Sequence, residues 1–250
     1  MTTTTVPTDP RLNALRTLLD GRWAPVREEV REQMGRFRPV RPGLSTEEYR
    51  ARVLDLMGEL AATKRPHAGF APEYGGEGDI GGTVVSFQTL GYGVQWGLFG
   101  GAVQVLGTSR HHDEYLRAIM DGELLGCFAM TETGHGSDVQ HLRTTATYDP
   151  ATREFVIDTP EPGARKDYIG NAARDGKMAV VFAQLVTGGA THGVHAFLMP
   201  IRDDAGAAMP GITISDCGEK AGLNGVDNGR LVFDHVRIPR EALLNRFADV

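Results

Sequence analysis

The sequence predicts an α+β protein with more than one domain. An N-terminal α-helical domain is expected at residues 1–122, followed by an antiparallel β-barrel-like domain at residues 123–238. Before residue 122, apolar residues recur at helical spacing; from Leu124 onward, apolar runs are short, rich in Val, Phe, Ile and Thr, and bounded by turn residues. Because no helix of about ten residues separates the expected strands, an antiparallel barrel or sandwich fits better than a parallel sheet built from βαβ units.

Composition and charge limit the classes of function. The 250 residues are 41% hydrophobic and 23% charged, which is ordinary for a globular protein. The formal net charge of −6 argues against nucleic acid or an anionic membrane surface as the main partner. No apolar run reaches the roughly 20 residues that a membrane-spanning helix needs. Two cysteines, Cys127 and Cys217, make no disulfide framework, which fits a reducing compartment and predicts a cytoplasmic location.

Three helices are expected near the N-terminus. Asp9-Pro10 opens the first, and its leucines recur at a spacing that predicts one buried stripe, made of Leu12, Leu15, Leu18 and Leu19. The second is expected over residues 22–37, before two prolines. Ser45 and Glu48 form a capping box that begins the third, with apolar positions at Tyr49, Val53, Leu56, Met57 and Leu60.

The remainder of the helical domain reads as a loop followed by buried helices. Residues 65–82 are rich in Gly and Pro and predict a loop. Residues 83–106 are apolar nearly all round, as in helices buried within a bundle. A short last helix is expected over residues 111–121, and Gly122 ends it.

Seven strands are expected in the second domain, and one further helix after it. The expected strands are 124–131, 143–148, 154–158, 177–186, 193–199, 211–215 and 230–236. Residues 143–158 read as a hairpin around an Asp-Pro turn. After Pro239, residues 240–247 predict the beginning of a helix, so residues 239–250 form a third, incomplete unit.

Metal and hydrolase sites are weakly supported. His192 and His195 are three residues apart on an expected strand, so they point to opposite faces and share no ion unless the strand bulges. Ser137 lies beside Asp138 and near His135, but residues this close on a Gly-rich turn rarely align as nucleophile and base. We therefore expect no metal and no hydrolase triad.

The most informative stretch is residues 126–142, which read GCFAMTETGHGSDVQHL. A strand runs into a turn with Gly134 and Gly136, followed by small polar residues. Glycine is required where a ligand approaches the backbone closely, so the stretch fits a strand end that presents N–H groups and hydroxyls to a flat or anionic ligand. A plain glycine-rich connection between two strands fits the same composition equally well.

The residues resemble the acyl-CoA oxidase and acyl-CoA dehydrogenase superfamily, and the oxidases most closely. Residues 129–137, AMTETGHGS, are similar to the flavin-contacting signature of the oxidases. Residues 166–171, KDYIGN, look like the dehydrogenases' K-x-W-I-T-N segment, with Tyr in the Trp position and Gly in the Thr position. Residues 195–202, HAFLMPIR, resemble an oxidase strand, and three further segments at 210–213, 218–229 and 236–241 keep the family's order.

The resemblance implies a fold and a reaction. The family has an N-terminal helical domain, a middle β-barrel-like domain and a C-terminal helical bundle, and the bundle is expected to be absent from this chain. The implied activity is that of an FAD-dependent acyl-CoA oxidase, which desaturates an acyl-CoA thioester to 2-enoyl-CoA and passes the electrons to O2, giving H2O2. Two alternatives stay open: an acyl-CoA dehydrogenase that uses a carrier protein, and a non-catalytic acyl-CoA-binding or assembly subunit. A homodimer, or a partner chain supplying the bundle, is expected.

The resemblance also implies roles for individual residues. The residues expected to contact FAD are Phe128, Ala129, Met130, Thr131, Tyr168, Ile169 and Gly170. Ser137 is expected to contact the thioester or pantetheine part of the substrate. Gly170 would leave room for oxygen near the flavin ring. No catalytic residue is assigned, because the family's base is a glutamate of the C-terminal bundle, and neither Glu132 nor Glu241 matches it.

Overall fold

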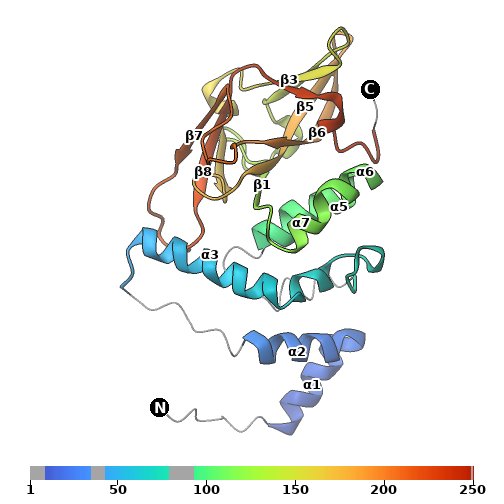
Figure 1. Ribbon diagram of the computed structural model, residues 1–250, viewed down its shortest axis with the longest axis vertical. Coiled ribbons are helices and arrows are strands. Elements are labelled where there is room, and N and C mark those ends of the chain that lie inside the picture. The colour runs from blue at the N-terminus through green and yellow to red at the C-terminus, as the bar shows by residue number, and fades with distance from the viewer. Residues whose placement is uncertain (1–8, 35–42, 79–92, 249) are drawn as a thin grey trace.

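The computed structural model describes residues 9–34, 43–78, 93–248 and 250, in which helices come first and strands follow (Figure 1). The helical part contains α-helices, 3-10 turns and two π-helical segments. Their bounds are α1 Pro10–Asp20, η1 Gly21–Trp23, α2 Ala24–Met34, α3 Thr46–Ala62, η2 Arg65–Gly69, η3 Pro72–Tyr74, η4 Gly93–Gly100, α5 Gly101–Leu106, α6 Ser109–His111, η5 His112–Leu116 and α7 Arg117–Met120. The expected loop at 65–82 therefore contains two 3-10 turns, and its last four residues lie outside the described chain, as do residues 83–92 and 35–37 of two expected helices.

Helix α3 begins and packs as the sequence predicts. The Ser45 hydroxyl accepts a hydrogen bond from the Glu48 amide at 3.3 Å, and the Glu48 carboxylate accepts one from the Ser45 amide at 2.8 Å. This confirms the capping box, which satisfies two amides that the first turn leaves unpaired. The expected apolar face is buried at Val53, Leu56, Met57 and Leu60.

The apolar stripe of α1 is a wrong prediction. Its four leucines are exposed: Leu12 59%, Leu15 50%, Leu18 76% and Leu19 74%. Helix α1 packs mainly on α2 and η1, at the end of the molecule farthest from the sheets (Figure 1). Helical spacing predicts an apolar face, but a face is buried only where another element covers it, and none of the described residues does so here.

Within the described residues, nine strands form two sheets. Their bounds are β1 Gly126–Ala129, β2 Thr145–Asp149, β3 Glu154–Asp158, β4 Lys166–Gly170, β5 Met178–Thr187, β6 Ala190–Pro200, β7 Ile212–Asp216, β8 Asn228–Phe233 and β9 Val236–Pro239. The larger sheet has the order β1-β5-β2-β3-β9, with β6 also paired to β5, and the smaller has the order β4-β8-β7. Strand β4 was expected only as a motif, and only the first residue of β9, Val236, lay within an expected strand, 230–236.

The larger sheet is mixed, which corrects the expectation of a purely antiparallel domain. Residues 126–129 of β1 and 145–147 of β2 both run parallel to β5, where they pair with residues 178–181 and 184–186. Parallel pairing needs a long crossover connection rather than a helix as such. Here β3, β4 and their loops provide that connection, so the lack of a helix between strands was not evidence against parallel pairs.

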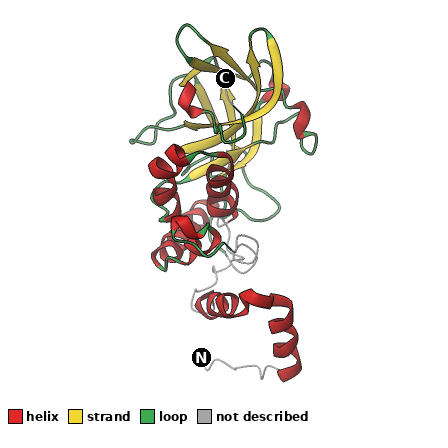
Figure 2. Cartoon of the chain, turned by 90° about the vertical axis from the view of Figure 1, so that its right-hand side faces the viewer, coloured by secondary structure: helices red, strands yellow, loops and turns green. Residues whose placement is uncertain are grey.

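The two sheets curl around a shared apolar core, and the helices cover one side of the larger sheet (Figure 2). Residues of both sheets, such as Phe197 and Phe233, are buried in that core. A second apolar cluster joins the helices to the sheet and includes Phe99, Ile119 and Val180. No helix of the described chain is long and apolar enough to cross a membrane.

The segment after β9 is not the helix that the sequence predicts. It forms a 3-10 turn, η8 Arg240–Ala242, and then runs between β6 and the helices. The Leu244 amide donates to the carbonyl of Ala196 at 2.9 Å, and the Arg246 amide donates to the carbonyl of Leu106 at 3.0 Å. Three consecutive residues, Ala242, Leu243 and Leu244, are buried because neighbours enclose the segment on both sides, and this burial pattern differs from that of a one-sided helix.

Candidate functional site

The two motifs expected to contact a flavin lie side by side in the structure. Residues beyond the end of β1 run next to the beginning of β4: the Asp167 amide donates to the carbonyl of Thr131 at 3.0 Å, and the Thr133 amide donates to the carbonyl of Arg165 at 2.9 Å. Glu132 and Lys166 also form an isolated antiparallel bridge. Segments about 35 residues apart in the sequence, by the numbering, are thus held on one ladder.

Strand alternation divides the expected flavin-contacting side chains of β1 between two faces. Phe128 and Met130 are half-buried and pack towards the helical layer, where the Phe128 ring lies 4.7 Å from that of Phe182. Ala129 is fully buried in the core between the sheets. Because successive side chains of a strand point to opposite faces, Ala129 contributes only its backbone to the face that Phe128 and Met130 form.

Thr131 is half-buried, and its hydroxyl makes no hydrogen bond within the part of the chain that the structure describes. Its carbonyl, in contrast, is fixed by the Asp167 amide. The residue therefore has a held backbone and an unused hydroxyl, which suits hydrogen bonding to a ligand.

Strand β4 presents Tyr168 outward through an irregular backbone. Its pairing with β8 shifts register between Lys166 and Ile169, and Tyr168 has a φ of +58°. The Tyr168 side chain is 62% exposed, so it is not a packed aromatic of the sheet core, whereas Ile169 is only 3% exposed. The Asn228 amide group holds this turn by donating to the carbonyl of Tyr168 at 2.6 Å.

Gly170 faces the helical layer. A Cβ atom placed there would lie 2.8 Å from Cγ2 of Val94 in η4, which is closer than real Cβ contacts. The glycine is therefore required by the close approach of strand and helix. This gives a packing reason for glycine at a position where the sequence suggested space for oxygen.

Sequence reasoning missed the buried pair beneath these residues. Glu132 and Lys166 have fully buried side chains, and Nζ of Lys166 lies 3.0 Å from Oε1 of Glu132. Each residue was visible in its motif, but nothing in the sequence linked the two. Charged side chains are seldom buried without a partner, but neither residue lay in an expected strand, so the sequence carried no signal that they are buried.

The loop before β8 supports Tyr168 from the other side. Lys220 donates to the carbonyl of Val226 at 2.7 Å and also bonds the side chain of Asn228. Asp227 lies nearby, and its pKa is raised to about 6 by burial and by the charge of Asp175. These contacts give structural roles to Lys220 and Asn228.

Ser137, the expected substrate contact, lies exposed in the turn that follows Glu132. Gly134 approaches the neighbouring backbone closely, since its amide donates to the carbonyl of Gly163 at 2.9 Å. Asp138 pairs with His141 at 2.6 Å rather than with His135. The role of Ser137 stays a prediction.

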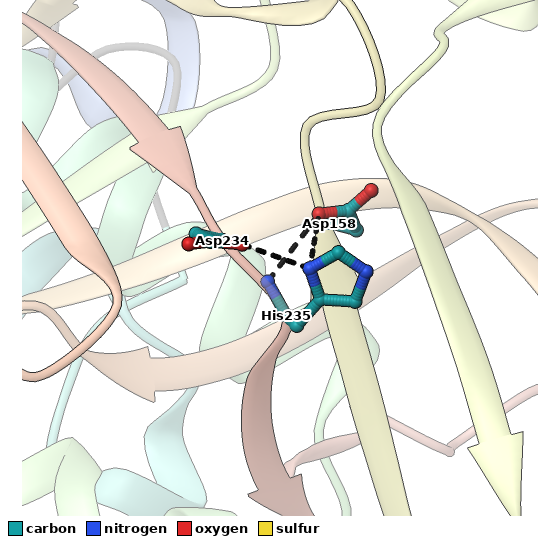
Figure 3. A group of neighbouring side chains, drawn as sticks. All are labelled: Asp158, Asp234 and His235. Carbon is teal, nitrogen blue, oxygen red and sulfur yellow. Dashed lines mark hydrogen bonds and ion pairs between the residues drawn. The ribbon is translucent and has the colours of Figure 1, made fainter.

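A group that could hold a metal ion lies elsewhere, at the turn between β8 and β9 (Figure 3). Asp158, Asp234 and His235 place ligand atoms within 4.8 Å of one another. Nδ1 of His235 lies 2.8 Å from Asp234 and 3.4 Å from Asp158, and hydrogen bonding to Asp234 together with the charge of Asp158 raises the pKa of the imidazole. These contacts describe a surface cluster of charges, and we assign it no metal.

Comparison with known proteins shows a likeness between the sheet part and a known family. Residues 127–236 match the family described as acyl-CoA dehydrogenase, middle domain. Over 63% of its length, the chain is 57% identical to "Acyl-coenzyme A oxidase 2, peroxisomal" from Arabidopsis thaliana, of which the match spans 24%. The chain thus spans about a quarter of that relative's length.

Solved structures give the same likeness across nearly the whole chain. Acyl-CoA oxidase 1 from Arabidopsis thaliana superposes with a TM-score of 0.77 at 30% identity, covering 96% of this chain and 37% of that one. Acyl-CoA oxidase-1 from Caenorhabditis elegans, solved in complex with FAD and ATP, superposes with a TM-score of 0.76 at 30% identity, covering 94% and 37%.

The comparison corrects the expected location. The sequence predicted a cytoplasmic protein, but the Arabidopsis relative carries a peroxisomal name, and so does a human relative that is 48% identical over 61% of the chain. The cytoplasmic prediction is therefore wrong. Its basis, two cysteines without a disulfide framework, describes any reducing compartment and does not distinguish one from another.

Proposed function

We propose that the chain, whose residues 127–236 match the family described as acyl-CoA dehydrogenase, middle domain, forms the flavin-contacting part of an FAD-dependent acyl-CoA oxidase. The reaction is the desaturation of an acyl-CoA thioester to 2-enoyl-CoA, with electrons passed to O2 to give H2O2. The observation that carries the proposal is the ladder joining Thr131 to Asp167, which brings both expected flavin motifs to one place.

The residues present fit a flat, redox-active ring. Phe128 and Met130 offer apolar surface on the face towards the helices, and Tyr168 extends an exposed aromatic ring from the neighbouring strand. The half-buried Thr131 has a hydroxyl without an intramolecular partner in the described chain, so it is free to bond the edge of a ring. We propose FAD contacts through these residues, through the backbone of Ala129 and Ile169, and through Gly170.

When bound, FAD would act as the acceptor of a hydride from the β carbon of the acyl chain. The residues of this chain orient the ring and the substrate beside it. The Thr131 hydroxyl, carried on a fixed backbone, is proposed to hydrogen-bond the edge of the ring. Ser137, exposed on the adjoining turn, is proposed to contact the thioester or pantetheine part of the substrate.

The proposal extends to the wider architecture. We propose three units, at residues 1–122, 123–238 and 239–250, with the two curled sheets forming a barrel-like middle domain. The family's base lies in a C-terminal helical bundle, so we propose that such a bundle completes the cleft and that the protein is a homodimer. The oxidase is favoured over a dehydrogenase because the relative at 57% identity is an oxidase.

Reconstitution tests this function. The chain, alone and with a partner carrying the bundle, is mixed with FAD and an acyl-CoA, and flavin absorbance, its bleaching and H2O2 are followed in air. An oxidase gives bleaching and peroxide without an added acceptor. Bleaching without peroxide, in which the flavin is reoxidised only by reducing an added carrier, would identify a dehydrogenase. A chain that takes up no FAD under either condition would refute the proposal.

A further inference from the structure

The buried Lys166–Glu132 ion pair joins the motif around Thr131 to the motif around Gly170. Lys166 stands in β4 and Glu132 just beyond β1, with 0% exposure for both side chains and 3.0 Å between Nζ and Oε1. All other ion pairs in the described part of the chain include at least one side chain that reaches solvent. A pair of this kind is costly to bury, so its geometry must be well satisfied.

Each donor of the Lys166 ammonium has an acceptor. Nζ donates to Glu132, to the carbonyl of Phe182 at 2.7 Å and to the carbonyl of Met130 at 3.2 Å. An ammonium has three N–H groups, so none is left over. The lysine thereby ties β4 to β5 and to the residue directly before Thr131.

The Glu132 carboxylate likewise accepts several hydrogen bonds. It accepts from the amides of Arg143 and Thr144 at 2.8 and 2.9 Å, and from the Thr144 hydroxyl at 2.6 Å. Burial raises the pKa of Glu132, but the charge of Lys166 and these hydrogen bonds outweigh burial and lower it overall. Burial lowers the pKa of Lys166 to about 8, which the charge of Glu132 opposes. Both groups are therefore charged at neutral pH.

We propose, on the basis of the function proposed above, that Lys166 and Glu132 are positioning residues that fix the Thr131 peptide against β4, so that its unused hydroxyl meets the flavin in one orientation. Thr131 lies between Met130, whose carbonyl the lysine holds, and Glu132, whose side chain the lysine pairs. Its own carbonyl is bonded by Asp167, the neighbour of the lysine. The residue is thus fixed on three sides without using its hydroxyl.

The test compares Lys166→Met, Glu132→Gln and the double variant with wild type. The matched control is Arg50→Met, which removes a buried cation paired to Asp216 on another part of the fold. Amide hydrogen exchange at Thr133 and Asp167, whose amides bond across the two motifs, needs no flavin. Val180, in the centre of the larger sheet, is the internal reference. FAD affinity is measured by quenching of flavin fluorescence.

We expect Lys166→Met to lose at least tenfold protection at Thr133 and Asp167, with Val180 unchanged, and to bind FAD at least tenfold more weakly. The double variant, which has no unpaired charge, is expected to regain thermal stability but not FAD affinity, because the Met130 carbonyl stays without its donor. If the pair had a purely structural role, the double variant would regain both thermal stability and FAD affinity. Arg50→Met is expected to change neither local protection at the motifs nor FAD affinity by more than twofold.

Three results overturn the proposal: uniform loss of protection across the sheet, unchanged FAD affinity in Lys166→Met, or recovery of FAD affinity in the double variant. If Lys166→Met does not fold, Glu132→Gln and the double variant decide by the same measurements. If wild type binds no FAD at all, the proposed function fails, while hydrogen exchange still shows whether the pair fixes the strand.

Discussion

His111 and Glu241 connect the helical layer to the segment that follows β9: Nε2 of His111 lies 3.0 Å from the carbonyl oxygen of Glu241. The other ring nitrogen, Nδ1, lies 3.1 Å from the amide nitrogen of Thr108. Because an amide only donates, Nδ1 is the acceptor and the ring is neutral, with its proton on Nε2. Only the hydrogen bond accepted at Nδ1 depends on the neutral form, because Nε2 carries a proton in both forms and donates to Glu241 in either.

Acidification is expected to destabilise the fold at His111, because a protonated Nδ1 cannot accept from the Thr108 amide and the charged ring is buried. Burial lowers the pKa of His111 below its usual value of about 6.5, so the folded state binds a proton less readily than the unfolded state. The contribution of His111 to stability is then complete above about pH 6.5 and is lost as the pH falls through the folded pKa. We expect the melting temperature to decline from pH 7.5 to pH 5, and to decline less in His111→Gln. His192→Gln, at an exposed ring, is the control, and equal slopes in all three proteins would contradict the prediction.

Gly170→Ala is expected to be destabilising because the new methyl group would meet Val94 at 2.8 Å. Overpacking of this kind costs about 1–3 kcal/mol of unfolding free energy. Val94→Ala in the same chain is expected to recover most of the loss, which a denaturant titration of both variants measures. Gly222→Ala, where nothing lies within 4 Å of the added atom, is the matched control. Additive losses in the double variant would show that the two residues do not interact.

The exposed leucines of α1 give a prediction about the isolated chain. Replacing Leu18 and Leu19 by lysine is expected to change the unfolding free energy by less than about 0.5 kcal/mol, because neither side chain is buried. Leu60→Ala, at a residue 1% exposed in α3, is expected to cost about 2–5 kcal/mol. A large loss in the lysine variant, seen in the same urea titration, would mean that the helix packs on its leucine face in solution.

The sequence predicted individual helices and strands better than it predicted which elements pack against one another. The Ser45–Glu48 cap and the buried face of α3 depend on residues within one helix, and both are confirmed. Burial of Leu18 depends on a covering element that no local pattern reports. The motifs at Thr131 and Gly170 were expected to converge through a family resemblance, since nothing in the spacing alone fixes which strands become adjacent.

The contacts that support the site, at Gly170 and between Lys166 and Glu132, could not be predicted from the sequence for a similar reason. The choice of glycine at position 170 follows from the nearness of Val94, which lies about 76 residues earlier by the numbering. The pairing of Lys166 with Glu132 depends on the ladder between two segments whose register no motif states. Such contacts are set by tertiary packing, which overrides local preference.

The attachment of both β1 and β2 to one edge of β5 has a consequence for how the protein is made. Residues 126–129 have no sheet partner on that edge until residues 178–181 have been synthesised, a delay of about fifty residues during translation. At the usual pace of synthesis, this is a wait of several seconds. During it, the emerging apolar strand is an unpaired edge, which can pair with other chains until β5 covers it.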